Sequence, residues 1–343
     1  MQRDAQNGAR SEGSIASPRP RYGLSFLVFL FAIFLSETVA LGEIVNRSPR
    51  VLILHPYDER LPATVIVGET AGNRLLEATA GKIDLFSEFL DLSRFPEKSH
   101  IDRMARYLAE KYADHRPDVI IAVGEAATSF IVNHRDRIAP EARIIFCCYD
   151  SASKMNLPSD VVGVFSELDI TKILEMARGL QPNARHLFII GGSSTFDRSW
   201  LASARADLAV PAKDYETTYL DDLTIDEFVE RAAHFPADSI VLFLTVAMDR
   251  TGRNFIPRQA LEQIAATASA PIYGPYDTYI GHGVVGGNAV TFESIGRTVA
   301  GLAVDALAGK PIANIDVPQT YFADARQLKR WGCPRTPFRP EPS

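Results

Sequence analysis

The residues best suited to hold a ligand directly follow apolar runs that are typical of buried parallel strands. Residues 119–123 form such a run, and Gly124 then leads into small residues that open a helical pattern. Free backbone N–H groups at a helix start can hold a carboxylate or another anion, and small side chains leave room for it. The alternative is an ordinary strand-to-helix turn, in which Gly124 only lets the chain reverse. The candidate ligand residues here are Gly124, Glu125, Ala126, Ala127 and Thr128, whose hydroxyl can add a hydrogen bond.

A second turn repeats this device later in the chain. Residues 186–190 form another apolar run, two glycines follow, and a helical pattern begins near Thr195. Ser193 and Ser194 are the candidate ligand residues of this turn. Two such turns facing one cleft favour ligand binding over two unrelated chain reversals.

Tyrosines and aspartates occupy the loops after several other predicted strands. Tyrosine rings stack on flat or apolar parts of a ligand while the hydroxyl orients it, and carboxylates bind ammonium or hydroxyl groups. Surface or hinge packing is the alternative for each tyrosine, and capping of a turn is the alternative for each aspartate. The candidates in these loops are Tyr57, Tyr149, Asp150, Asp249, Tyr276 and Asp277.

No pattern of catalytic or metal-binding residues accompanies these loops. The glycine-rich stretch 281–287 is followed by no Gly-Lys-Ser/Thr and does not bridge a strand and a helix as a dinucleotide fingerprint does, so we predict a hinge-crossing return to the first lobe. His282 within it has no identifiable partner for general-base chemistry. No Gly-x-Ser-x-Gly or His-Glu-x-x-His motif occurs. We therefore expect no catalytic residue, no metal, no cofactor and no enzyme activity.

The three cysteines, Cys147, Cys148 and Cys333, show no Cys-x-x-Cys or Cys/His spacing. Adjacent cysteines rarely bond to each other, because disulfide geometry is demanding. We interpret Cys147 and Cys148 as small buried hydrophobic residues and Cys333 as a thiol of the tail.

Short apolar runs alternate with longer helical patterns from residue 50 onward, which predicts parallel sheets with helices on both faces. Residues 149–166 lack a helical period and separate two such series, so we expect an α/β chain of two lobes with a ligand cleft between them. The last helical pattern, about 293–309, has no strand of its own and is suited to pack on the first lobe. The predicted parts are lobe 1 (50–165), lobe 2 (166–280), the return to lobe 1 with the last helix (281–312) and a final crossover (313–330).

Composition and the N-terminal segment indicate an exported, ligand-binding chain. The formal charge of −6 argues against a general nucleic-acid binder, which usually has a basic face. A polar, arginine-containing segment precedes the apolar run 24–35, and small residues follow it up to Ala40. This predicts a signal peptide over residues 1–40, or an uncleaved anchor, and a periplasmic location. We predict a monomer and a disordered tail over 331–343.

Three segments together resemble the substrate-binding proteins of ABC transporters, of the tryptophan/tyrosine-binding type. These segments are residues 118–128, residues 271–278, and residues 283–287 together with Gly296 and Arg297. The resemblance covers about residues 50–325 and implies a two-lobed periplasmic binding protein fold (type I-like). It also implies that the helix start matching 126–128 holds a ligand carboxylate and that the loop matching Asp277 closes over the ligand. The family often has a small residue and Asp-Pro where this chain has Cys148-Tyr149-Asp150-Ser151, and the bulky Tyr149 argues against an aromatic amino acid.

The function expected from these features is capture of an amino acid or a small or aromatic carboxylate for an ABC importer, whose membrane permease recognises the closed form. The segment 276–287 also resembles extracytoplasmic sensor domains of histidine kinases. A sensor module reporting to a membrane kinase is therefore the first alternative. An enzyme built on a doubly wound fold is the second.

Overall fold

A computed structural model describes residues 47–149, 157–166 and 169–334, and the described residues from Ser48 onward belong to one structural unit. The predicted signal peptide with its cleavage point near Ala40, the candidate Asp150 and residues 335–343 of the predicted tail lie outside the described residues. Among the residues that are described, no helix has both the length and the apolar character needed to cross a bilayer.

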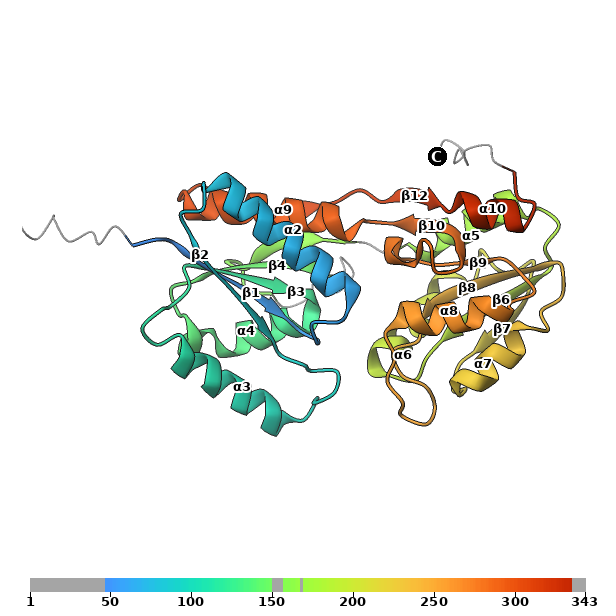
Figure 1. Cartoon of the computed structure of the whole chain (residues 1–343), viewed down its shortest axis with the longest axis horizontal. Helices are drawn as coiled ribbons and strands as arrows, with labels where there is room; N and C mark the ends of the chain where they lie inside the picture. The colour runs from blue at the N-terminus through green and yellow to red at the C-terminus, as the bar shows by residue number, and fades with distance from the viewer. Residues whose placement is uncertain (1–46, 150–156, 167–168, 335–343) are drawn as a thin grey trace, which may run out of the picture. The chain divides into compact units, whose positions relative to one another are not determined.

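The first sheet has the strand order β11-β5-β4-β3-β1-β2, and its strands pair in parallel (Figure 1). Its central strands are continuous apolar runs, as expected for strands covered on both faces. The strands are β1 (Arg50–His55), β2 (Asp84–Phe89), β3 (Val119–Val123), β4 (Arg143–Tyr149), β5 (Val162–Phe165) and β11 (Ile315–Asp316).

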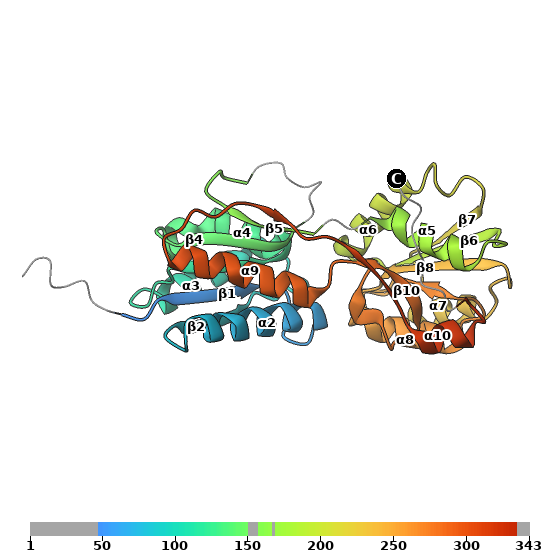
Figure 2. The ribbon, with the colours of Figure 1, turned by 90° about the horizontal axis from the view of Figure 1, so that it is seen from above.

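Helices cover both faces of the first sheet, because alternate residues of one strand point in opposite directions. Val51 and Ile53 of β1 pack with α2 and α9 in one apolar cluster, whereas Leu52 and Leu54 pack with α3 and α4 in another. Figure 2 shows α2 and α9 side by side although they are far apart in the sequence. The helices are α2 (Pro62–Ala78), α3 (Lys98–Lys111), α4 (Gly124–Ile138) and α9 (Phe292–Leu307).

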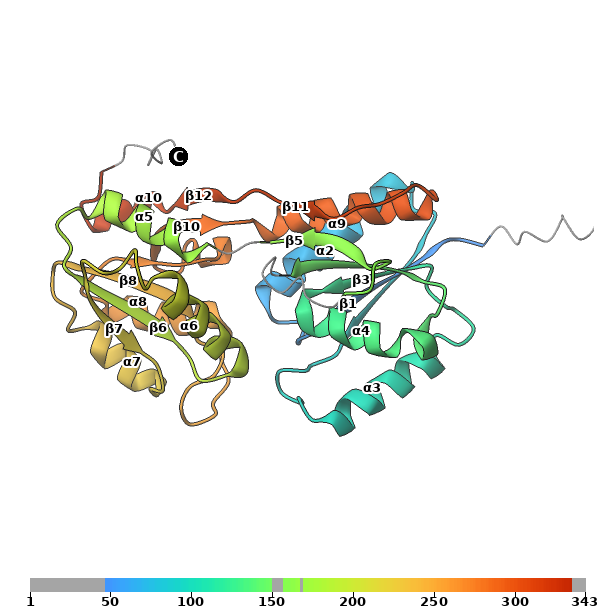
Figure 3. The ribbon, with the colours of Figure 1, turned by 180° about the vertical axis from the view of Figure 1, so that it is seen from behind.

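The second sheet has the order β12-β10-β9-β8-β6-β7, parallel except for β12, which runs antiparallel to β10. Helices α5 and α6 pack on one face, and α7 and α8 on the other (Figure 3). The strands are β6 (His186–Gly191), β7 (Glu216–Leu220), β8 (Ser239–Thr245), β9 (Ile272–Tyr273), β10 (Val284–Ala289) and β12 (Thr320–Ala323). The helices are α5 (Ile170–Leu180), α6 (Thr195–Asp207), α7 (Ile225–Ala232), α8 (Pro257–Thr267), the short 3-10 helix η2 (Asp277–Tyr279) and α10 (Ala325–Arg330).

The glycine-rich stretch 281–287 does not cross between the lobes, contrary to the prediction. Its second half begins β10, a buried strand of the second sheet between β9 and β12. A Cβ at Gly287 would lie 1.9 Å from the carbonyl oxygen of Gly274 and 2.9 Å from the ring of Phe322. Glycine is therefore present because neighbouring backbone and side chains approach closely, not because a hinge must bend.

The segments at the two predicted crossovers also contain strands. β5 lies inside 149–166 and β11 inside 313–330, and both belong to the first sheet, whereas β12 and α10 belong with the second. The described chain thus changes sheets between Phe165 and Ile170, between Ala289 and Phe292, and between Asp316 and Thr320. The predicted α/β class, with two mainly parallel sheets flanked by helices, is confirmed.

Candidate ligand-binding site

The strand order of each sheet reverses at one place, and many of the candidate residues lie in the loops there. In the first sheet β1 lies between β2 and β3, and in the second β6 lies between β7 and β8. Open α/β sheets bind ligands beyond the carboxyl ends of their strands at such points. We call the loops 55–58 and 124–128 the first-sheet edge, and the loops 191–195 and 245–249 the second-sheet edge.

Helix α4 at the first-sheet edge begins without a side-chain cap. Its N-cap residue, Val123, has no side-chain acceptor for the N–H groups of the first turn. Gly124 has φ +76°, a left-handed conformation that strains any residue with a Cβ. The backbone thus presents donors at the end of a buried strand, where the helix dipole favours an anion.

The side chains of this turn fall into two groups. Glu125 is exposed and Ala126 half-buried, so both are accessible beside Gly124. Ala127 and Thr128 are buried, and the Thr128 hydroxyl donates a hydrogen bond of 2.8 Å to the carbonyl oxygen of Gly124. Thr128 therefore supports the turn from within.

Helix α6 at the second-sheet edge is capped by the protein's own carboxylate. Ser194 Oγ accepts from the Asp197 N–H at 3.0 Å, and Asp197 Oδ2 accepts from the Ser194 N–H at 3.0 Å. Asp197 also accepts hydrogen bonds from the backbone N–H groups of Ala247 (3.0 Å) and Met248 (3.2 Å). Burial raises the pKa of Asp197, while these hydrogen bonds oppose the shift. The two helix starts, similar in sequence, are thus chemically different.

Ser193 and Asp249 occupy the loops beside Asp197. The Ser193 N–H donates to the carbonyl oxygen of Met248 at 2.7 Å, and its buried Oγ has no hydrogen-bond partner among the described residues. The Asp249 carboxylate accepts from Thr251 Oγ1 at 2.6 Å and from the N–H groups of Thr251 and Arg253 at 2.9 and 3.2 Å. Asp249 is therefore engaged in closing its own loop, as a turn-capping aspartate would be.

An aromatic cluster surrounds Tyr276. Its ring centroid lies 5.7 Å from that of Trp200, 5.3 Å from Tyr279 and 5.8 Å from Phe292, against which it stacks at 23°. Burial raises the pKa of the Tyr276 hydroxyl well above its usual value. The candidate Tyr57 lies 6.5 Å from Phe196, which is 40% exposed on the first turn of α6. These rings provide flat surfaces of the kind that hold apolar parts of a ligand.

Asp277 begins the short helix η2 next to Tyr276. Its Oδ1 is buried and has no hydrogen-bond partner among the described residues. Burial raises the pKa of Asp277, and the backbone N–H of Phe292 donates to the carboxylate and opposes that shift. A buried acceptor without a partner is costly, so a donor supplied by a ligand would be stabilising.

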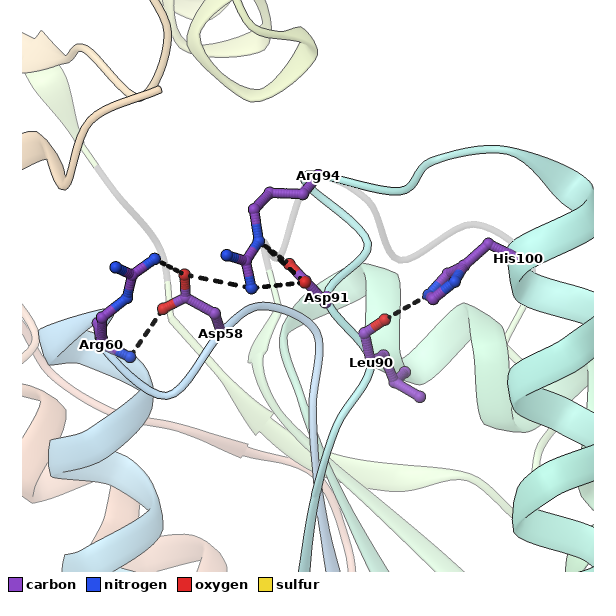
Figure 4. A network of polar contacts seen from close by, with 6 residues as sticks. All are labelled: Asp58, Arg60, Leu90, Asp91, Arg94 and His100. Atoms are coloured by element: carbon purple, nitrogen blue, oxygen red, sulfur yellow. Dashed lines mark hydrogen bonds and ion pairs between the residues drawn. The ribbon is translucent and has the colours of Figure 1, made fainter. Parts of the chain in front are cut away.

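A network of ion pairs borders the first-sheet edge beyond β1 and β2 (Figure 4). Asp58 pairs with Arg60 at 2.8 Å, and Arg94 pairs with Asp91 at 2.6 Å and with Asp58 at 3.7 Å. The hydrogen bond from Arg60 lowers the pKa of Asp58. The network ties the loop after β1 to the loop after β2.

His55 belongs to this edge as the last residue of β1. It is 2% exposed, stacks on Phe89 with ring centroids 4.5 Å apart, and its Nδ1 has no partner among the described residues. Burial lowers the pKa of His55 to about 4. The ring is therefore neutral in the folded protein near pH 7.

Several residues of this region were missed from the sequence. Asp197 carried a signal, since Ser194-x-x-Asp197 is a capping-box pattern at a predicted helix start. Trp200 and Arg94 carried none, because only the fold brings them to the site. Tyr149 ends β4, while Asp150 lies outside the described residues. The described residues contain no group of three or more His, Cys, Asp or Glu side chains able to hold a metal ion.

Two mainly parallel sheets with helices on both faces, between which the chain crosses more than once, have the same architecture as solved substrate-binding proteins. No family model matches the sequence, and no curated protein sequence matches it. Solved structures match over most of the chain, and the fold implied by the sequence resemblance is confirmed.

Three of these structures illustrate the match. A ligand-free substrate-binding protein with adhesive properties from Clostridium difficile is 14% identical, with a TM-score of 0.62 over 84% of this chain and 96% of that chain. An ABC domain in complex with L-Trp from Streptococcus pneumoniae is 11% identical, with a TM-score of 0.60 over 84% and 95%. A periplasmic ribose ABC transporter protein from Conexibacter woesei is 15% identical, with a TM-score of 0.52 over 83% and 95%.

Proposed function

We propose that this protein is a periplasmic solute-binding protein that captures a small molecule bearing an anionic group for an ABC importer. One observation carries the proposal: α4 begins without a side-chain cap, whereas Asp197 already occupies the start of α6. A ligand carboxylate can therefore accept hydrogen bonds from the backbone N–H groups of Gly124, Glu125 and Ala126. The N–H of Ser194 already donates to Asp197, so a ligand could use it only by breaking the capping box.

The rest of the ligand contacts would come from the aromatic residues and from Asp277. Tyr57 and Tyr276 supply flat surfaces, and the unpartnered Oδ1 of Asp277 suits an ammonium or hydroxyl donor. A ligand with a carboxylate at one end and a donor at the other, such as an amino acid, satisfies both. Ser193 Oγ is a further contact in this proposal, while Ala127, Thr128 and Asp249 support the loops.

The role requires no chemistry on the ligand. Contacts from both lobes would stabilise a closed form, and a membrane permease would recognise that form of the monomeric protein. The aspartates and tyrosines named above serve to bind the ligand, because none of them forms a nucleophile and general-base pair with another.

A ligand screen tests the proposal. The purified protein is heated with amino acids, small carboxylates, aromatic acids and sugars, and a compound at 100 times its Kd should stabilise it by about 2.7 kcal/mol. Hits among carboxylates support the proposal. Stabilisation by neutral sugars alone, or by no compound in a folded, ligand-free preparation, contradicts it.

A substitution tests the site. Asp277→Asn keeps the shape of the side chain but removes its charge, so we expect an amino-acid hit to bind about tenfold more weakly or worse by calorimetry. Asp136→Asn, which neutralises an exposed carboxylate on α4, is the matched control and should bind as the parent protein does.

The neighbouring genes distinguish import from sensing. Permease and ATPase genes favour an importer, whereas kinase genes favour a sensor module.

A further inference from the structure

Strand β4 contains one extra residue where it ends. Phe146 pairs with Gly163 and Tyr149 with Phe165, so three steps along β4 match two along β5. Cys147 and Cys148 together therefore lie opposite Val164, which is the two-against-one arrangement of a β-bulge. A Cβ at Gly163 would lie 2.0 Å from the carbonyl oxygen of Phe146, so glycine permits the close strand approach at this place.

The bulge turns the two cysteines to the same side of the sheet. Neighbouring side chains of a regular strand point to opposite faces. Here Cys148 has φ +55°, a left-handed conformation that is strained for a residue with a Cβ. As a result Cys147 and Cys148 pack in the same apolar cluster, and the hydrogen bond between their side chains raises the pKa of Cys147.

This arrangement removes one of two obstacles to a bond between adjacent cysteines. Neighbouring Cα atoms are about 3.8 Å apart, shorter than the ~4.4–6.8 Å usual for disulfides, and in a regular strand the two sulfurs also point apart. The backbone at Cys148 removes the second obstacle, because it turns the Cys148 side chain into the cluster that contains Cys147. Cys147 is buried and Cys148 is partly exposed. An external disulfide can therefore reach the Cys148 thiol but not the Cys147 thiol.

We propose that Cys147 and Cys148 form a redox-active dithiol, which closes to an intrachain disulfide by exchange with a small-molecule or protein disulfide. The thiolate of Cys148 attacks the external disulfide, forms a mixed disulfide and releases one thiolate. That thiolate takes the proton of Cys147, whose sulfur then attacks the Cys148 sulfur and releases the second thiolate, which takes up the proton that Cys148 lost on ionising. Two cysteine thiols are oxidised, and one external disulfide is reduced to two thiols.

The dithiol lies beside the aromatic cluster of the candidate site. Cys148 and Tyr276 both pack against the apolar cluster that contains Cys147, and Tyr276 contacts Trp200 edge-on at 5.7 Å. Closing the disulfide moves the Cys148 sulfur and should alter the surroundings of Trp200. The chain has two tryptophans, so Trp331→Phe leaves Trp200 as the sole fluorescent reporter.

Mass spectrometry tests the proposal independently of any ligand. The folded protein is incubated with oxidised glutathione, alkylated under denaturing conditions and digested with trypsin. Residues 144–154 form one tryptic peptide that holds both cysteines, and Cys333 falls in another. We expect the first peptide to lose the mass of two hydrogen atoms and to resist alkylation, in the parent protein and in Cys333→Ser alike. Dithiothreitol should restore both thiols easily, because so short a bridge is strained.

Three outcomes would overturn the proposal. They are a stable glutathione adduct on Cys148 with Cys147 still alkylated, two alkylated thiols after oxidant treatment, and a disulfide-linked dimer. Cys147→Ser is the variant control, and it should stop at the glutathione adduct. In Trp331→Phe, oxidation should shift Trp200 emission reversibly, and the shift should vanish when Cys147→Ser is added. Ligand binding can fail in the screen above without affecting any of these results.

Discussion

Asp197 accepts a hydrogen bond from the backbone N–H of Ala247 at 3.0 Å, which joins the start of α6 to the loop after β8. The same carboxylate caps α6 through Ser194, so one buried side chain organises both loops of the second-sheet edge. At the first-sheet edge, Glu125 lies in the first turn of α4, but no side chain among the described residues caps that helix. The second-sheet edge is therefore held together by internal hydrogen bonds, whereas the start of α4 at the first-sheet edge keeps backbone N–H groups that a ligand can use.

Asp197→Ala should lower the free energy of unfolding by about 2–4 kcal/mol, because several buried N–H groups lose their acceptor at once. Urea denaturation followed by circular dichroism measures the change. Ser194→Ala, which removes only the cap, should cost about 1 kcal/mol. Asp214→Asn neutralises an exposed carboxylate and serves as the control. Equal stabilities of the Asp197 and Asp214 variants would refute this role.

His55 should make the fold sensitive to mild acid. Its folded-state pKa of about 4 lies below the ordinary value of 6.5, so the unfolded chain binds the proton more readily. The stability that neutral His55 contributes is therefore complete above about pH 6.5 and is lost as the pH falls toward 4. The full loss is about 3 kcal/mol for a buried imidazole shifted by this much.

Denaturation midpoints measured between pH 4 and 7 test this effect. His55→Asn removes the titrating group and should flatten the pH dependence over that range, whatever it does to the stability at pH 7. His115→Asn changes an exposed histidine and should leave the dependence unaltered. Parallel pH profiles for the parent and His55→Asn would show that the burial of His55 is not responsible.

Gly124→Ala should lower both stability and ligand affinity. Its left-handed backbone costs an alanine about 1 kcal/mol, and a methyl group here crowds the donors at the start of α4. Gly81 has φ +73° with nothing within 4 Å of an added Cβ, and it lies after α2, before β2. Gly81→Ala should therefore lose similar stability yet bind a hit from the screen normally by calorimetry. If both variants bind equally well, the start of α4 is not part of the ligand site.

The sequence determined the class of the fold and the places where a ligand would be sought. Continuous apolar runs such as 119–123 bury on both faces whatever surrounds them, and helical periods between them require parallel crossovers. Loops after such strands gather at the carboxyl edge, so local pattern alone predicted Tyr57, Gly124 and Ser194 as candidate ligand residues.

The pairing of the strands, and which of these groups remain free, could not be predicted from local sequence. In sequence, the residues of β10 resemble a flexible glycine-rich loop, and only their pairing with β9 and β12 makes them a strand. The strands β5 and β11 are too short to show a hydrophobic period. Whether a helix start can hold a ligand depends on a carboxylate that reaches it through space, as Asp197 does for α6. Local sequence sets backbone preference, but hydrogen-bond partners and burial arise from contacts between distant segments, and these gave Asp197, Asp277 and the cysteine pair their distinct chemistry.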